Sequence, residues 1–211
     1  MIVQQERSAV PDSSPPEPRF KRLSADDRAV ELVQAALGVL AEGGITAFTI
    51  DKISKRAGAS RGLIGHHFGN KDGLLAACYS AAYAPLLQML QAESQPPPLP
   101  QLIDELFSDS QFRSDGLNIW LALWSEIAVN PDLQAEHLRH YQVYETAVAK
   151  SIALLAQMRG REVDARMLAT ALIALLDGLW LELCIAPGRM SVSKARLAVK
   201  VLLEPHLGAI D

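Results

Sequence analysis

A tight glycine turn between two short predicted helices constrains the fold of this chain more than any other feature. Thr49 can cap a first helix, and Gly58 can end it because glycine tolerates positive φ. Ser60 is a good N-cap for the next helix, and Asn70 for a third. The reversal between the first two helices takes only about three to four residues. The segment 49–75 is therefore predicted to form a helix-turn-helix.

Small helical domains of this kind insert their second helix into the DNA major groove. Leu63, Ile64 and Phe68 can pack inward, which leaves small or polar residues on the outer face, where a backbone can approach DNA closely. The alternative is an ordinary helical hairpin whose charges are solvated. The candidate DNA-binding residues are Thr49, Lys52, Ser60, Arg61, Gly62, Gly65, His66, His67 and Lys71.

The distribution of charge favours the DNA interpretation. The whole chain has a net charge of −4, which alone argues against a nucleic-acid partner. The segment 19–71, however, holds nine basic and five acidic side chains, a net of +4, so the remainder carries −8. A basic head on an acidic body attracts phosphate at one end only.

Several residues of this head resemble the DNA-binding domain of TetR-family transcriptional regulators over about Ala25 to Leu75. They are Ser60-x-Gly62, Phe68, Asn70-Lys71-Asp72 and Leu74-Leu75, and the segment from Ile45-Thr46 to Gly58 fits the preceding part of that domain. The resemblance implies an all-helical homodimer that represses transcription until a small molecule releases it from a palindromic operator.

A second resemblance concerns the rest of the chain. His66 and Phe68, together with Trp120, Trp124 and the run 176–181, are similar to the BetI-type subgroup of choline-responsive repressors. The chain departs from the common family pattern at Gly65 and His67, where tyrosine is usual. It departs from the BetI-type subgroup at Glu182, where that resemblance leads us to expect a basic residue.

The helical period is nearly continuous, which predicts an all-α fold with no strands. We expect a disordered, proline-containing leader over 1–18, an N-terminal three-helix helix-turn-helix domain over 19–72 and a larger C-terminal helical domain for ligand binding and dimerisation over 73–211. The expected helices are 24–42, 50–57, 61–67, 71–93, 99–112, 116–129, 131–158, 162–186 and 191–207.

Nothing in the apolar pattern predicts a membrane span or a secreted protein. The longest apolar runs are broken by Asp177, Gly178 and Glu182, well short of the ~20 residues that a bilayer requires. The leader lacks the apolar core of a secretory signal. The two cysteines, Cys78 and Cys184, indicate a reducing cytoplasm more than a disulfide framework.

Aromatic residues and one acid suggest a site for a cationic effector. Trp120 and Trp124 lie four residues apart on one helix face, and Asp177 and Trp180 lie three apart on another. Indole rings and a carboxylate attract a quaternary ammonium or another cation. Tryptophans in a helical bundle are more often simply core residues. A carboxylate in an apolar run, by contrast, needs a cation, a capping role or a wet cavity.

Tyr141, Tyr144 and Glu145 form a second possible ligand cluster, for which a surface or dimer-edge face is an equal alternative. The candidate ligand-binding residues are Trp120, Trp124, Tyr141, Asp177 and Trp180.

The last two predicted helices carry more apolar surface than one facing layer requires, so we expect a homodimer through a four-helix bundle. Such a dimer would place two recognition helices roughly 34 Å apart, or a small multiple of that distance, to read a palindrome. The expected interface residues are Leu168, Ala171, Leu172, Leu175, Leu179, Leu183, Val192, Ala195, Val199, Leu202 and Leu203.

Enzymatic interpretations have little support. Glu136, His137 and His140 have a metal-like spacing, but a solvated helix face explains them, and His66 with His67 suits DNA contact better than acid–base chemistry. The sequence has no glycine-rich phosphate loop and no nucleophile elbow. We therefore predict no catalytic site, metal or cofactor. The first alternative is a ligand-binding or scaffold protein that no longer binds DNA. A less favoured alternative is an unrecognised helical enzyme.

Overall fold

The computed structural model describes residues 24–91, 96–108, 114–186 and 188–210, so the leader expected over 1–18 lies outside the described part. Within these ranges the chain is all-helical, as predicted. The helices are α1 (Ala25–Ala47), α2 (Ile50–Ala57), α3 (Arg61–Phe68), α4 (Lys71–Gln91), α5 (Leu99–Leu106), α6 (Ser114–Ile127), α7 (Pro131–Met158), α8 (Ala165–Ile185) and α9 (Val192–Leu207).

The glycine turn forms as the sequence predicts. Thr49 Oγ1 accepts a hydrogen bond from the Lys52 backbone N–H at 3.3 Å and caps α2. Gly58 ends that helix in the left-handed conformation, at φ 59° and ψ 33°. Ser60 occupies the N-cap position of α3, but its hydroxyl makes no capping hydrogen bond. Asn70 Oδ1 accepts from the Gly73 N–H at 2.8 Å at the start of α4.

Two expected boundaries are wrong for identifiable reasons. Helix α1 continues to Ala47 rather than residue 42, with a kink at Gly44, whose φ of 60° interrupts the helix without ending it. Helix α8 begins only at Ala165, because Asp164 caps it by accepting from the Met167 N–H at 2.9 Å. A third expected boundary, the helix end at residue 112, is also wrong, because α5 ends at Leu106 and Phe107 forms its C-cap. The expected end at residue 93 lies outside the described part.

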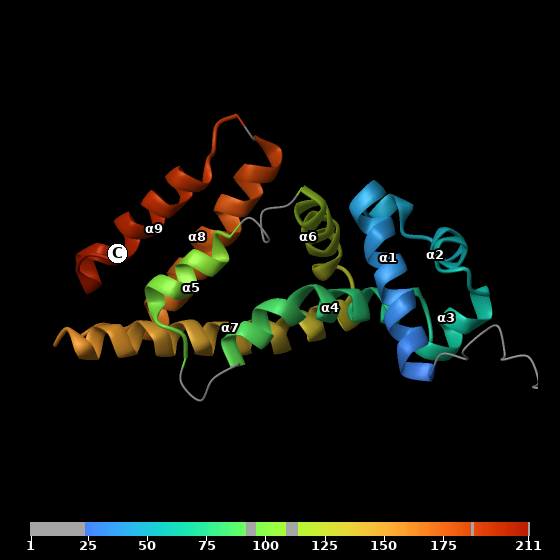
Figure 1. Cartoon of the computed structure of the whole chain (residues 1–211), viewed down its shortest axis with the longest axis horizontal. Coiled ribbons are helices and arrows are strands. Elements are labelled where there is room, and N and C mark those ends of the chain that lie inside the picture. Colours follow the sequence, from blue (N-terminus) through green and yellow to red (C-terminus); the bar gives the residue numbers. More distant parts are fainter. Residues whose placement is uncertain (1–23, 92–95, 109–113, 187, 211) are drawn as a thin grey trace, which may run out of the picture.

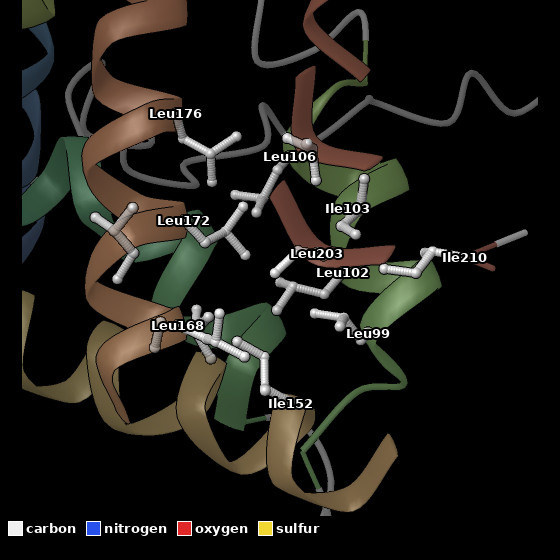
Figure 2. Close-up of a cluster of buried hydrophobic side chains, with 14 of the residues drawn as sticks. Leu99, Leu102, Ile103, Leu106, Ile152, Leu168, Leu172, Leu176, Leu203 and Ile210 are labelled. Atoms are coloured by element: carbon white, nitrogen blue, oxygen red, sulfur yellow. The ribbon is translucent and has the colours of Figure 1, made fainter. Parts of the chain in front are cut away.

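Buried side chains form two clusters. The first joins α1, α2, α3 and the start of α4 to α6 and α7, and includes Leu32, Phe48, Ile53, Ile64, Leu74, Tyr79, Leu123 and Leu133. The second joins the end of α4 to α5, α7, α8 and α9. Figure 2 shows leucine and isoleucine side chains of α5, α7, α8 and α9 gathered in this cluster. Helix α4 therefore contributes to both clusters.

The arrangement places the helix-turn-helix at one end of the molecule. Figure 1 shows α1, α2 and α3 together at that end, with α7 running along the molecule beside α4 and with α9 at the far end. Only Gly69 and Asn70 separate α3 from α4. The direction of α4 therefore fixes where the recognition helix lies.

Two helices, Ala25–Ala47 and Lys71–Leu90, are long and apolar enough to cross a membrane by length and composition alone. The expectation above missed them because it considered only uninterrupted apolar runs. Both helices carry side chains of the first buried cluster, including Leu40 on α1 and Tyr79 on α4, each with no exposed surface. Core helices of water-soluble proteins pass the same test.

Six of the eleven residues expected at the dimer interface are buried inside the protomer. Leu168, Leu172, Leu179, Ala195, Val199 and Leu203 are buried in the second cluster of the protomer itself. That part of the prediction is wrong, because α8 and α9 use those faces against each other and against α7. A different face stays open: Leu197 is 60% exposed and Val201 is 69% exposed. They line a shallow groove along α8 and α9 with Ala171, Leu175, Ala198 and Leu202.

Candidate nucleic-acid interface and effector cavity

The outer face of α3 is exposed to solvent, and two of its residues are glycines. Ile64 is buried beneath it, and Leu63 and Phe68 are half-buried. Gly62 and Gly65 are exposed, and a Cβ added at either position would meet no atom within 4 Å. A DNA backbone or base edge could therefore approach the helix closely at these two positions.

Basic side chains flank this face. Lys52 on α2 and Lys71 at the start of α4 are both exposed, and the Lys71 ammonium lies 5.8 Å from the centre of the Phe48 ring. Arg61, the first residue of α3, is held by Asp51 of α2. The nine candidate DNA-binding residues thus lie on one exposed module, and among them only His67 is half-buried.

A cavity in the body gathers aromatic side chains from several helices. The empty space among them is about 470 Å³, counting the part that is open to solvent. The cavity is lined by Ala82, Tyr83 and Leu86 of α4, Leu106 of α5, Trp120 and Trp124 of α6, Tyr144 of α7, and Leu176, Asp177 and Trp180 of α8.

The structure brings four of the five candidate ligand residues to this cavity. Tyr141 is the exception, because its ring packs against His137, with ring centres 5.3 Å apart, and it does not line the cavity. Its helical neighbour Tyr144 does. Sequence reasoning missed Tyr83 on α4, although its spacing of four from Tyr79 places both rings on one helix face and could have indicated it.

The rings are arranged with faces and edges toward each other. The centres of Trp120 and Trp124 are 6.2 Å apart, and Tyr83 stands edge-on to Trp120 at 4.9 Å. Such contacts stabilise the ring positions beyond simple burial. These contacts hold the rings of the cavity wall against each other.

Asp177 is the single charged side chain among the lining residues that the structure describes. Burial raises the pKa of its carboxyl from 3.8 to about 6. Asp177 is nevertheless an exposed residue, so solvent still reaches it and the effect of burial on its charge is partial. Burial also raises the pKa of Tyr83 to about 12, and the negative charge of Asp177 adds to that rise.

Glu136, His137 and His140 are not the solvated helix face that we expected. The Glu136 and His140 side chains are each only 18% exposed, and His140 Nε2 lies 3.3 Å from Glu136 Oε2. Ser80 Oγ of α4 donates to Glu136 Oε2 at 3.0 Å, and the Tyr79 hydroxyl lies 2.8 Å from His137 Nδ1.

These contacts attach α7 to α4. No group of three or more metal-binding side chains occurs among the described residues.

Comparison with known proteins identifies the family. Residues 32–78 match the family described as "Bacterial regulatory proteins, tetR family", and residues 98–208 match "BetI-type transcriptional repressor, C-terminal". The chain belongs to the BetI-type TetR regulators. It is thus a ligand-responsive, DNA-binding transcriptional regulator with an N-terminal helix-turn-helix domain and a C-terminal helical domain. Both resemblances noted in the sequence are confirmed.

Curated relatives of this BetI-type chain agree with that assignment. The regulator BetI of Burkholderia thailandensis is 31% identical over 190 residues, which cover 85% of this chain and 95% of the relative. BetI 1 of Chromohalobacter salexigens is 33% identical over 183 residues, covering 84% of this chain and 89% of the relative. TetR-family regulators are not enzymes; they bind operator DNA and small-molecule effectors, and they form dimers.

Solved structures of TetR-like regulators share the fold. A transcriptional regulator from Pseudomonas aeruginosa PAO1 has a TM-score of 0.76 at 28% identity, covering 89% of this chain and 93% of its own. A regulator from Saccharomonospora viridis, solved in complex with choline, has a TM-score of 0.71 at 22% identity, covering 85% of this chain and 96% of its own.

Replacing Asp177 by asparagine should alter how stability depends on pH. The folded protein binds the Asp177 proton more tightly than the unfolded chain does, so ionisation of this group weakens the folded state. The variant should match the wild type below about pH 4, gain stability relative to it as pH rises from about 4 to about 6, and keep that advantage at higher pH. Urea unfolding at fixed protein concentration measures this, and a difference that does not vary with pH contradicts it.

Proposed function

We propose that this regulator is a cytoplasmic homodimer that leaves its operator when a cationic effector enters the aromatic cavity. The observation that carries the proposal is the meeting of three indoles, two phenols and a lone carboxylate in one cavity, with α4 forming part of its wall. The cytoplasmic placement is supported by the family and by the thiol of Cys78, which is buried and free.

The DNA contacts are proposed for the exposed face of α3 and the residues around it. Gly62 and Gly65 leave room for close approach, while His66 and Arg61 can reach base edges from the same helix. Ser60 and His67 lie at the ends of this face. Thr49, Lys52 and Lys71 surround it, where contacts to phosphate and sugar position a protein on the duplex.

The effector is proposed to be a quaternary ammonium or a similar cation. Trp120, Trp124 and Trp180 present aromatic surfaces that attract cations, and Asp177 supplies a full negative charge above about pH 6. A cation beside Asp177 would offset the cost of burying its charge. The choline found in the Saccharomonospora viridis regulator fits this chemistry.

The response is proposed to pass through α4. Ala82, Tyr83 and Leu86 of this helix line the cavity, and α3 ends two residues before α4 begins. An effector that favours one tilt of α4 therefore favours one spacing of the recognition helices in the dimer. DNA affinity falls by the difference in effector affinity between the two geometries.

The dimer is proposed to form through the open face of α8 and α9. Leu197 and Val201 are large, apolar and mostly exposed, and Leu175 and Leu202 lie in the same groove. A contiguous apolar surface of this kind marks a protein–protein interface. Burying it against the same face of a second copy gives a closed, two-fold symmetric assembly.

Lys71→Ala should weaken operator binding uniformly across sequences and lower the slope of log affinity against log salt by about one unit. Fluorescence anisotropy over a series of salt concentrations measures the slope. Lys150→Ala, an exposed lysine of α7, is the matched control and should bind as the wild type does. A wild-type slope for the Lys71 variant removes this lysine from the phosphate contacts.

The double variant Trp180→Ala, Asp177→Asn should bind operator DNA as the wild type does, but choline should no longer release it from the DNA. The variant lacks one aromatic ring of the cavity wall and the negative charge of the carboxyl. The neutral analogue of choline, in which a tert-butyl group replaces the trimethylammonium group, should release neither the wild type nor the variant from DNA. Tyr141→Phe, outside the cavity, is the control and should respond like the wild type. Thermal shift and anisotropy measure both effects; an undiminished choline response in the double variant overturns the cavity assignment.

Leu197→Glu with Val201→Glu should convert the dimer to monomers and reduce operator affinity, because charges replace apolar contact across the interface. These side chains are exposed in the protomer, so each protomer should still fold. Leu138→Glu, on an exposed site of α7, is the control and should remain dimeric. Light scattering measures the mass, and a dimeric double variant places the interface elsewhere.

A further inference from the structure

We propose that Asp51 is a positioning residue that holds the Arg61 guanidinium ready to read a guanine in the operator. This inference rests on the proposed function, since it requires α3 to enter the major groove. It adds to the base contact proposed above for Arg61 the residue that orients this arginine.

The two side chains join the two helices of the helix-turn-helix. Arg61 Nε lies 2.6 Å from Asp51 Oδ1, and Arg61 Nη2 donates to Asp51 Oδ2 at 2.7 Å. This is a two-point contact in one plane, which fixes both the position and the rotation of the guanidinium. A single hydrogen bond would leave the group free to rotate.

The contact with Asp51 leaves other N–H donors of the guanidinium available to a base. Arginine has five N–H donors, and Asp51 takes the one on Nε and one of the two on Nη2. The remaining Nη2 donor and one Nη1 donor point away in parallel. Two parallel donors match the O6 and N7 acceptors of guanine, which form the commonest specific arginine contact in the major groove.

The position of Arg61 suits this role. It is the first residue of α3, and the N-terminal residues of a recognition helix are those that contact base edges. Gly62 follows it directly, and a Cβ there would meet open space, so this position leaves room beside the arginine.

Stability does not account for the pair. The Arg61 side chain is 73% exposed and that of Asp51 is 61% exposed, and exposed ion pairs contribute little to folding. An acidic residue on a DNA-binding face also repels phosphate. Its presence beside the recognition arginine is explained if it orders that arginine before binding, which lowers the entropy lost in the complex.

The test is selection of preferred sequences from a pool of random DNA duplexes, followed by affinity measurements on the preferred duplex and on single-base-pair replacements. We expect a G·C pair at one position of each half-site. Arg61→Ala should lower the preference for it by about 5- to 150-fold. Asp51→Asn should lower it by about two- to tenfold, because the arginine then has to be ordered on binding.

Two further variants separate positioning from charge. In an Arg61→Lys background, which has no two-point fork, Asp51→Asn should cause no further loss of preference. Asp72→Asn removes the same charge from an exposed site at the start of α4 and should leave base preference unchanged. All variants should melt close to the wild-type temperature, since the pair is exposed.

Two results overturn the inference while the proposed function stands. One is uniformly tighter binding of Asp51→Asn to every duplex, which means that Asp51 only repels phosphate. The other is an Arg61→Ala variant with a lower salt slope but unchanged base preference, which makes Arg61 a phosphate contact. If the wild type binds no duplex even at low salt, the proposed function fails and this inference fails with it.

Discussion

The structure depends above all on helix α4, because this one helix belongs to both buried clusters and begins two residues after the end of α3. Leu74 and Tyr79 anchor its first half among α1, α6 and α7, and Leu90 anchors its end among α5, α7 and α8. Tyr83, between these anchors, faces the cavity. In the proposed response, a change at the cavity wall would reach the DNA-binding end through the packed side chains of α4.

The cavity combines two opposing physical requirements. Aromatic rings exclude water and favour a cation, whereas the Asp177 carboxyl loses hydration there, as its raised pKa indicates. In the proposed site, a bound cation would interact with Asp177 more strongly than in bulk water, because this carboxyl has lost part of its hydration. The same loss of hydration would make cation binding depend on pH, since the carboxyl is fully charged only above about pH 6.

Much of the fold and part of the site could be predicted from local pattern. Caps at Thr49 and Asn70, the turn at Gly58 and the helical period gave the helices, since these signals act within a few residues. The spacing of Tyr79 and Tyr83 indicates a shared face of α4, but which of the two rings lines the cavity could not be predicted, because it depends on how α4, α6 and α8 cross. For the same reason Tyr141, His140 and half of the expected dimer residues were assigned to the wrong surroundings.

The sequence by itself determined an all-helical regulator with a basic helix-turn-helix head. Helix caps, helical periodicity and charge segregation depend on residues that are close together in the sequence. Only the tertiary structure decided which apolar faces of α8 and α9 are core and which stay open, and which aromatic rings meet Asp177. Those choices depend on the side-chain packing of helices far apart in the chain. One helix face can satisfy its hydrophobic pattern against several partners, and three-dimensional fit selects among them.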